Sequence, residues 1–67
     1  MYKYRRIRDL REDNDLTQQQ VAEILNIKYQ QYQRYESGEY EIPLHYLIKL
    51  AEHYKVSLDY LVELRNF

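Results

Sequence analysis

The feature that most limits how this chain can fold is its shortage of backbone breakers, because its 67 residues include one glycine, Gly38, and one proline, Pro43. Residues of these two types separate most secondary-structure elements. Where they are scarce, periodic apolar segments must follow one another closely, and polar residues must cap the helix ends. We therefore expect helices joined by tight turns rather than by long loops.

Apolar residues recur at helical spacing in five segments, and no segment shows the alternation typical of a strand. The sequence therefore predicts an all-α fold, a bundle of five helices. The predicted helices span approximately residues 4–13, 18–25, 29–37, 43–54 and 58–64.

Residues at the ends of these segments supply the expected caps. Thr17 precedes the second helix and Gln20 follows three residues later, which is the spacing of a capping box. Asn26 tolerates the left-handed conformation that often ends a helix. Pro43 is expected in the first turn of the fourth helix, where its missing N–H is no loss, and Ser57 is expected to cap the fifth.

The second and third predicted helices are separated only by Asn26–Lys28, with the aliphatic Ile27 inside the turn. Two helices joined by such a tight turn form the helix-turn-helix pattern. At the helical period, the third helix has an inward face that includes Tyr32 and Glu36. Its outward face carries long hydrogen-bonding side chains, Gln30, Gln33 and Arg34.

The length limits the chain, residues 1–67, to a single domain with one modest core, because a domain of about 60 residues buries only about 60% of the surface of its unfolded chain. It contains no cysteine, so neither a disulfide nor a thiolate zinc site is available to stabilise it. No apolar run approaches the roughly 18 residues that span a bilayer, and the first residues lack the apolar centre of a signal peptide. A cytoplasmic protein with no membrane contact is expected.

The series of motifs resembles the Cro/phage-repressor-type helix-turn-helix family, often called the XRE family. The stretches that carry the resemblance are "RIRDLREDNDLTQQQVAEILNI" at 6–27, "YQRYESG" at 32–38 and "IPLHYLIKLAEHYKVSLDYL" at 42–61. The resemblance implies a lambda-repressor-like bundle that binds double-stranded operator DNA, commonly as a homodimer. It also implies a sequence-specific transcriptional regulator, expected to act as a repressor on a near-palindromic operator.

The outward face of the third helix suits base edges in the major groove, because Gln pairs with adenine N6 and N7 and Arg with guanine O6 and N7. From this chemistry and the resemblance, we expect base contacts from Tyr29, Gln30, Gln33 and Arg34. Contacts to the DNA backbone are expected from Gln18, Arg6, Lys28 and Tyr40. The net charge is −1, but Lys and Arg cluster in the first eleven residues, which gives the chain a basic end.

By family position, Arg11 and Glu36 match an ion pair that joins the first and third helices. The end of the chain has more apolar residues than one face of a short helix can bury, and we expect these residues to form a dimer interface. They are Leu58, Leu61, Val62, Leu64 and Phe67. Isologous pairing through this end would set the two recognition helices about one DNA turn, roughly 34 Å, apart.

A protein-binding module of the same fold, antitoxin-like or adaptor, is the alternative, because tyrosine is frequent at interface hot spots and the chain has nine. Catalysis has little support, since the sequence offers neither a nucleophile–base arrangement nor a phosphate-binding glycine loop. His45 and His53 lie eight residues apart with no third ligand nearby, so neither a metal nor another cofactor is expected.

Overall fold

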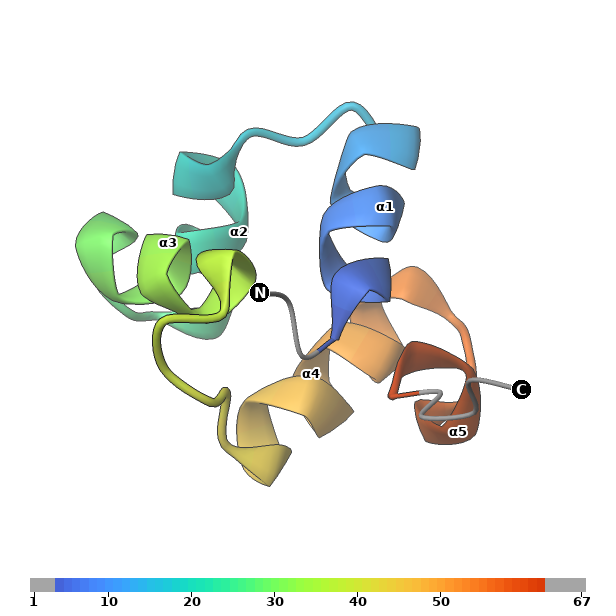
Figure 1. Ribbon diagram of the computed structural model, residues 1–67. Helices are drawn as coiled ribbons and strands as arrows, with labels where there is room; N and C mark the ends of the chain where they lie inside the picture. The colour runs from blue at the N-terminus through green and yellow to red at the C-terminus, as the bar shows by residue number, and fades with distance from the viewer. Residues whose placement is uncertain (1–3, 63–67) are drawn as a thin grey trace.

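The computed structural model describes residues 4–62, and over that range it consists of five helices without a strand (Figure 1). The helices are α1 (Arg5–Asp13), α2 (Gln18–Leu25), α3 (Tyr29–Ser37), α4 (Leu44–Tyr54) and α5 (Leu58–Leu61). The predicted all-α class and the order of the five helices are confirmed. The last helix was predicted to extend to Leu64, but it ends at Leu61, with Val62 as its C-cap.

Four turns contain a residue in the left-handed conformation, although the chain has one glycine. These residues are Asp15, Asn26, Gly38 and Lys55, with φ of 57°, 60°, 87° and 59°. After α2 the N–H of Ile27 donates to the carbonyl of Ala22 at 2.9 Å, and after α4 the N–H of Val56 donates to the carbonyl of Ala51 at 3.0 Å. These bonds close Schellman-type turns. The left-handed conformation costs about 1 kcal/mol at a residue with a side chain. The chain nevertheless adopts it at Asp15, Asn26 and Lys55, so three of its short turns form without glycine.

The predicted side-chain caps of α2 and α5 are confirmed. The Thr17 hydroxyl accepts the Gln20 N–H at 3.1 Å, and the Gln20 amide oxygen accepts the Thr17 N–H at 2.8 Å, which completes the capping box. The Ser57 hydroxyl accepts the N–H of Tyr60 at 3.0 Å. Pro43 was predicted inside the first turn of α4, but it is the N-cap, with an extended ψ of 151°.

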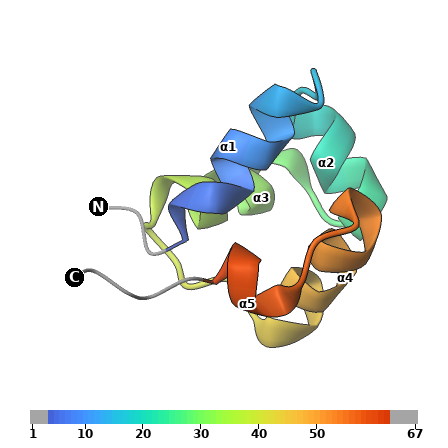
Figure 2. The same ribbon diagram turned by 90° about the vertical axis from the view of Figure 1, so that its right-hand side faces the viewer.

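The core lies between the inner faces of the helices, and α3 packs against both α1 and α2 (Figure 2). Its buried apolar side chains are Ile7, Val21, Ala22, Leu25, Tyr32, Ile42, Leu47, Leu50, Ala51 and Leu61. Tyr32 is among the largest of them and is 0% exposed. Because a buried hydroxyl without a hydrogen bond is unfavourable, Tyr32 must find a partner inside the protein.

One residue near the end of the chain was wrongly predicted to lie in a dimer interface. Leu61 was expected in a dimer interface, but it is 1% exposed because it packs into the core of a single chain. Leu58 and Val62 are half-buried and pack against the same core. Leu64 and Phe67 lie outside the described residues. Leu58 and Val62 are therefore the described members of the predicted interface that keep some exposed surface.

Candidate nucleic-acid interface

The helix-turn-helix lies at one side of the molecule, with α3 outermost beside α2 (Figure 1). Lys28, at the N-cap of α3, has an extended backbone and makes no side-chain cap. The four predicted base-contacting side chains all lie on the exposed face of α3: Tyr29, Gln30, Gln33 and Arg34. The structure thus brings this predicted set together on one helix face.

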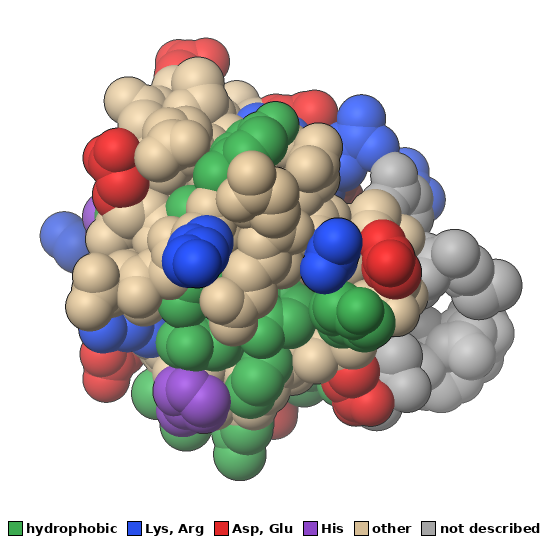
Figure 3. Space-filling view, turned by 90° about the vertical axis from the view of Figure 1, so that its left-hand side faces the viewer, with side chains coloured by type: hydrophobic (Ala, Val, Ile, Leu, Met, Phe, Trp, Pro, Cys, Tyr) green, Lys and Arg blue, Asp and Glu red, His purple; other side chains and the backbone are tan. Residues whose placement is uncertain are grey.

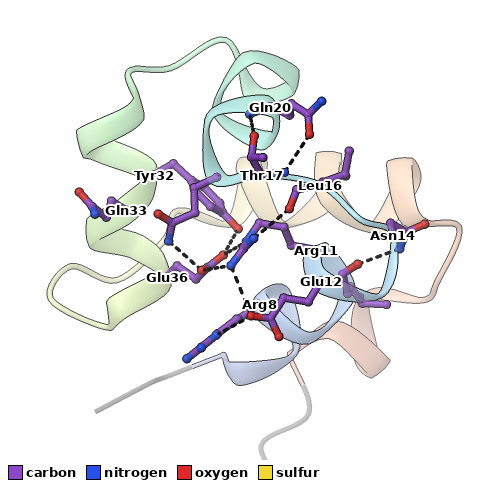
Figure 4. A network of polar contacts seen from close by, with 12 residues as sticks. Arg8, Arg11, Glu12, Asn14, Leu16, Thr17, Gln20, Tyr32, Gln33 and Glu36 are labelled. Atoms are coloured by element: carbon purple, nitrogen blue, oxygen red, sulfur yellow. Dashed lines mark hydrogen bonds and ion pairs between the residues drawn. The ribbon is translucent and has the colours of Figure 1, made fainter.

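The inner face of the same helix is fixed by the carboxylate of Glu36, which is buried (Figure 4). Arg11, from α1, donates to it twice, from Nε to Oε2 at 2.8 Å and from Nη2 to Oε1 at 3.0 Å. The hydroxyl of Tyr32 donates to Oε2 at 2.6 Å, and Nε2 of Gln18 donates to Oε1 at 2.9 Å. The predicted Arg11–Glu36 pair is therefore confirmed as a two-point contact that clamps α1 to α3.

These contacts determine the protonation states of the cluster. Burial by itself raises the pKa of Glu36, but hydrogen bonds from Arg11, Tyr32 and Gln18 outweigh it, so the pKa lies below its ordinary value of 4.5. The hydrogen bond to Glu36 raises the pKa of Arg11. Burial, followed by the hydrogen bond to Glu36, raises the pKa of Tyr32. Glu36 and Arg11 are thus charged near neutral pH, and Tyr32 keeps the proton that it donates.

Gln18 has a second contact that the sequence did not predict. Its Oε1 accepts the hydroxyl of Tyr29 at 3.4 Å, while its Nε2 donates to Glu36. Nε2 of Gln33 in turn donates to the Tyr29 hydroxyl at 3.4 Å. Gln18 was predicted only to contact the DNA backbone from the start of α2. In the structure it also links the exposed face of α3 to the buried carboxylate of Glu36. No spacing rule relates residues on two different helices, so the sequence contained no signal for this link.

The other residues predicted to contact the DNA backbone lie in two separate places. Lys28 is exposed at the start of α3. Tyr40 is 52% exposed, and the Arg34 guanidinium lies 5.6 Å from the centre of its ring. Arg6 lies elsewhere, 4.0 Å from the ring centre of Tyr60 on α5. Lys28 and Tyr40 thus flank the α3 face, whereas Arg6 packs against α5.

The charge on this side of the molecule is sparse. Arg34 is the one basic residue in the sequence of α3, and Glu39 and Glu41 follow the helix. Figure 3 shows separate basic patches rather than a continuous basic surface. Sequence-independent attraction to phosphate is therefore weak here, and directional hydrogen bonds from α3 would have to supply more of any free energy of DNA binding.

Within residues 4–62 the structure has neither a metal-binding cluster nor a membrane-spanning helix. That part of the chain contains no group of three or more His, Cys, Asp or Glu side chains placed to hold a metal ion. No helix in it has both the length and the apolar character needed to cross a membrane.

The tight turn between α2 and α3, with polar side chains on the outer face of α3, defines a helix-turn-helix domain. The chain belongs to the helix-turn-helix family, since the family model of that description matches residues 7–61. The predicted XRE-type resemblance is confirmed.

Two proteins illustrate the relationship. Over 61 residues the chain is 40% identical to the HTH-type transcriptional regulator YobD of Bacillus subtilis (strain 168), a match that covers 91% of this chain and 54% of that protein. Its fold is similar to the crystal structure of a transcriptional regulator from Listeria innocua, with a TM-score of 0.81 and 31% identity. That match covers 91% of this chain and 57% of the other. The chain thus spans a little over half the length of either protein.

Proposed function

We propose that this protein is a sequence-specific transcriptional regulator that inserts α3 into the major groove of operator DNA and acts as a repressor. The family membership supports DNA binding, and the names of the two similar proteins support a role in transcription. In this arrangement the outer face of α3 contacts base edges, while Lys28 and the start of α2 contact the phosphate backbone.

The observation that carries the proposal is the division of α3 into two faces. Buried Tyr32 and Glu36 hold the helix to the rest of the domain. Gln30 and Arg34 lie one turn apart on the exposed face, and both can form paired hydrogen bonds with a base. A rigidly held helix with exposed bidentate side chains suits base recognition, because little backbone ordering is left to be done on binding.

We also propose that the protein acts as a homodimer on a near-palindromic operator. Leu58 and Val62 keep some exposed surface beside Tyr60, which is exposed. Isologous contact through this end of the molecule would repeat α3 about one DNA turn away, roughly 34 Å. The proposed interface no longer includes Leu61, since the core contains it.

Selection of bound sequences from random duplex DNA tests this function directly. The expected result is an enriched motif with two inverted half-sites, whose centres lie about 10 base pairs apart. Sedimentation with and without the selected duplex tests the dimer, and two chains per duplex are expected. Enrichment of a single, asymmetric half-site with one chain bound would exclude the dimer, and no enrichment at all would exclude sequence-specific DNA binding.

A protein-binding role is a second candidate, because large apolar side chains lie exposed next to the acidic residues that follow α3. Leu44 is 59% exposed and Ile48 is 42% exposed, one turn apart on α4. Glu39 and Glu41, nearby in the sequence, disfavour phosphate. A salt titration with mixed-sequence DNA separates the two roles, because DNA binding weakens steeply with salt. Absence of measurable DNA binding at low salt would favour the protein partner.

A further inference from the structure

A continuous path of hydrogen bonds leads from the buried carboxylate of Glu36 to the exposed face of α3. It passes through Gln18 at 2.9 Å, then Tyr29 at 3.4 Å, and ends at Gln33 at 3.4 Å. Gln18, Gln33 and Glu36 also line one open groove between α1, α2 and α3.

The first link fixes the orientation of Gln18. An ionised carboxylate can only accept hydrogen bonds, whereas a side-chain amide donates from nitrogen and accepts at oxygen. Gln18 must therefore turn its Nε2 toward Glu36, and its Oε1 is left to face Tyr29. The ambiguity between the two ends of an amide, which usually has to be settled from the surrounding hydrogen bonds, is removed here by the charge on Glu36.

The second and third links carry this direction to the surface. The Tyr29 hydroxyl has one hydrogen, which it donates to Oε1 of Gln18. Only its lone pairs remain, so Gln33 must approach it with Nε2 and turn Oε1 away. Both outer bonds are long, so they add little stability. Their effect is to choose between two orientations of one amide, and exclusion of water on DNA binding strengthens such bonds.

We propose that Glu36, acting through Gln18 and Tyr29, makes Gln33 present a hydrogen-bond acceptor to DNA, so that Gln33 selects a base with an amino group in the major groove, adenine N6 or cytosine N4. Guanine O6 and thymine O4, which are acceptors, are disfavoured at the same place. The inference rests on the proposed DNA-binding function and extends it. Gln18 and Tyr29 are positioning residues, and Gln33 determines specificity.

The variant Tyr29→Phe tests the proposal by removing one hydroxyl from an exposed side chain. Base preferences are measured by selection from random duplexes and by titration of the chosen site with single base changes. In the wild type, the base pair read by Gln33 is expected to favour adenine or cytosine over guanine or thymine by about tenfold. In Tyr29→Phe the Gln33 amide is free to turn, and we expect this ratio to fall below about threefold, with an unchanged melting temperature.

The chain offers a matched control on the same helix. Nε2 of Gln31 donates to the hydroxyl of Tyr35 at 2.9 Å, a second glutamine–tyrosine pair that has the same i to i+4 spacing. Tyr35→Phe should leave every base preference as it is in the wild type. A loss of preference in both tyrosine variants would show a general effect of removing hydroxyls and would overturn the proposal.

A rescue experiment distinguishes orientation from contact. Gln33→Glu replaces the amide by a group that only accepts, so the double variant Tyr29→Phe/Gln33→Glu should regain the preference for adenine or cytosine, although its added charge weakens binding to all sequences. Failure of the double variant to regain it would contradict the proposal, as would an unchanged profile in Tyr29→Phe. With either of these two outcomes, a wild-type protein that still prefers certain bases would leave sequence-specific DNA binding intact. A wild-type protein without any base preference would contradict sequence-specific DNA binding as well.

Discussion

The inner and outer faces of α3 carry similar side chains but have different surroundings. Tyr32 on the inner face is 0% exposed and donates to Glu36 at 2.6 Å, whereas Tyr29 on the outer face is 36% exposed and has contacts of 3.4 Å. Side-chain type alone therefore does not decide the role of a residue within this helix. Surroundings do, because burial turns a polar group into a structural anchor and exposure leaves it available to a ligand.

The largest expected effect comes from removing the anchor of the inner face. Glu36→Ala leaves the guanidinium of Arg11 and the hydroxyl of Tyr32 without their shared acceptor, so the free energy of unfolding should fall by about 3 kcal/mol. Chemical denaturation measures this loss. Gln30→Ala, on the exposed face, is the control and should change stability by less than about 0.5 kcal/mol. Equal stability of the two variants would mean that the faces do not differ as described.

The two tyrosines allow a sharper form of the same test. Tyr32→Phe removes a buried hydroxyl that donates to a charged acceptor, and we expect a loss of about 1.5 kcal/mol. Tyr29→Phe removes a hydroxyl with long, exposed contacts and should be almost neutral for stability. Thermal unfolding of both variants under one set of conditions provides the measurement. A larger loss in Tyr29→Phe than in Tyr32→Phe would reverse the comparison.

Because the pKa of Glu36 is lowered in the folded protein, its contribution to the free energy of unfolding should depend on pH. The unfolded chain takes up a proton at Glu36 near its ordinary pKa of 4.5, before the folded chain does. The stability contributed by this carboxylate is therefore complete above about pH 4.5 and is lost as the pH falls through the lower folded pKa. The difference in stability between the wild type and Glu36→Gln should be constant above that pH and should shrink below it. A constant difference down to pH 2 would contradict the shifted pKa.

A small effect is expected at the edge of the outer face. If Lys28 neutralises a phosphate, Lys28→Ala should weaken binding to all DNA sequences alike and reduce the logarithmic salt slope by about one unit. Titrations at several salt concentrations, with the selected duplex and with mixed DNA, supply both quantities. A loss confined to the selected duplex would instead assign Lys28 to base recognition.

The sequence predicted those parts of the fold that depend on neighbouring residues. The capping box of Thr17 and Gln20 and the left-handed end of α2 at Asn26 follow from local hydrogen bonding, and both are confirmed. Lys55 was not expected in the left-handed conformation, because its side chain gives no local reason for it. The N–H groups of Lys55 and Val56 close the turn after α4, and Val56 packs against the core, which holds Lys55 in this conformation.

The candidate site was also predictable only in part. The outward set on α3 follows from helical period, and the Arg11–Glu36 pair follows from family position; the structure brings each set together. The link from Gln18 to Tyr29 depends on how α2 and α3 cross, which periodicity along one helix does not contain. The burial of Leu61 was missed for a related reason, since the apolar surface of α5 finds its partner within the same chain.

Base reading by the outer face of α3 can be checked by measuring the affinity of Gln30→Ala and Arg34→Ala for the selected duplex and for random DNA. Each variant should lose about 1–3 kcal/mol of binding free energy on the selected duplex, relax the preference at one base pair and keep nearly all of its weak binding to random DNA. If both variants bind the selected and the random duplex as the wild type does, the outer face of α3 is solvated surface and does not read bases.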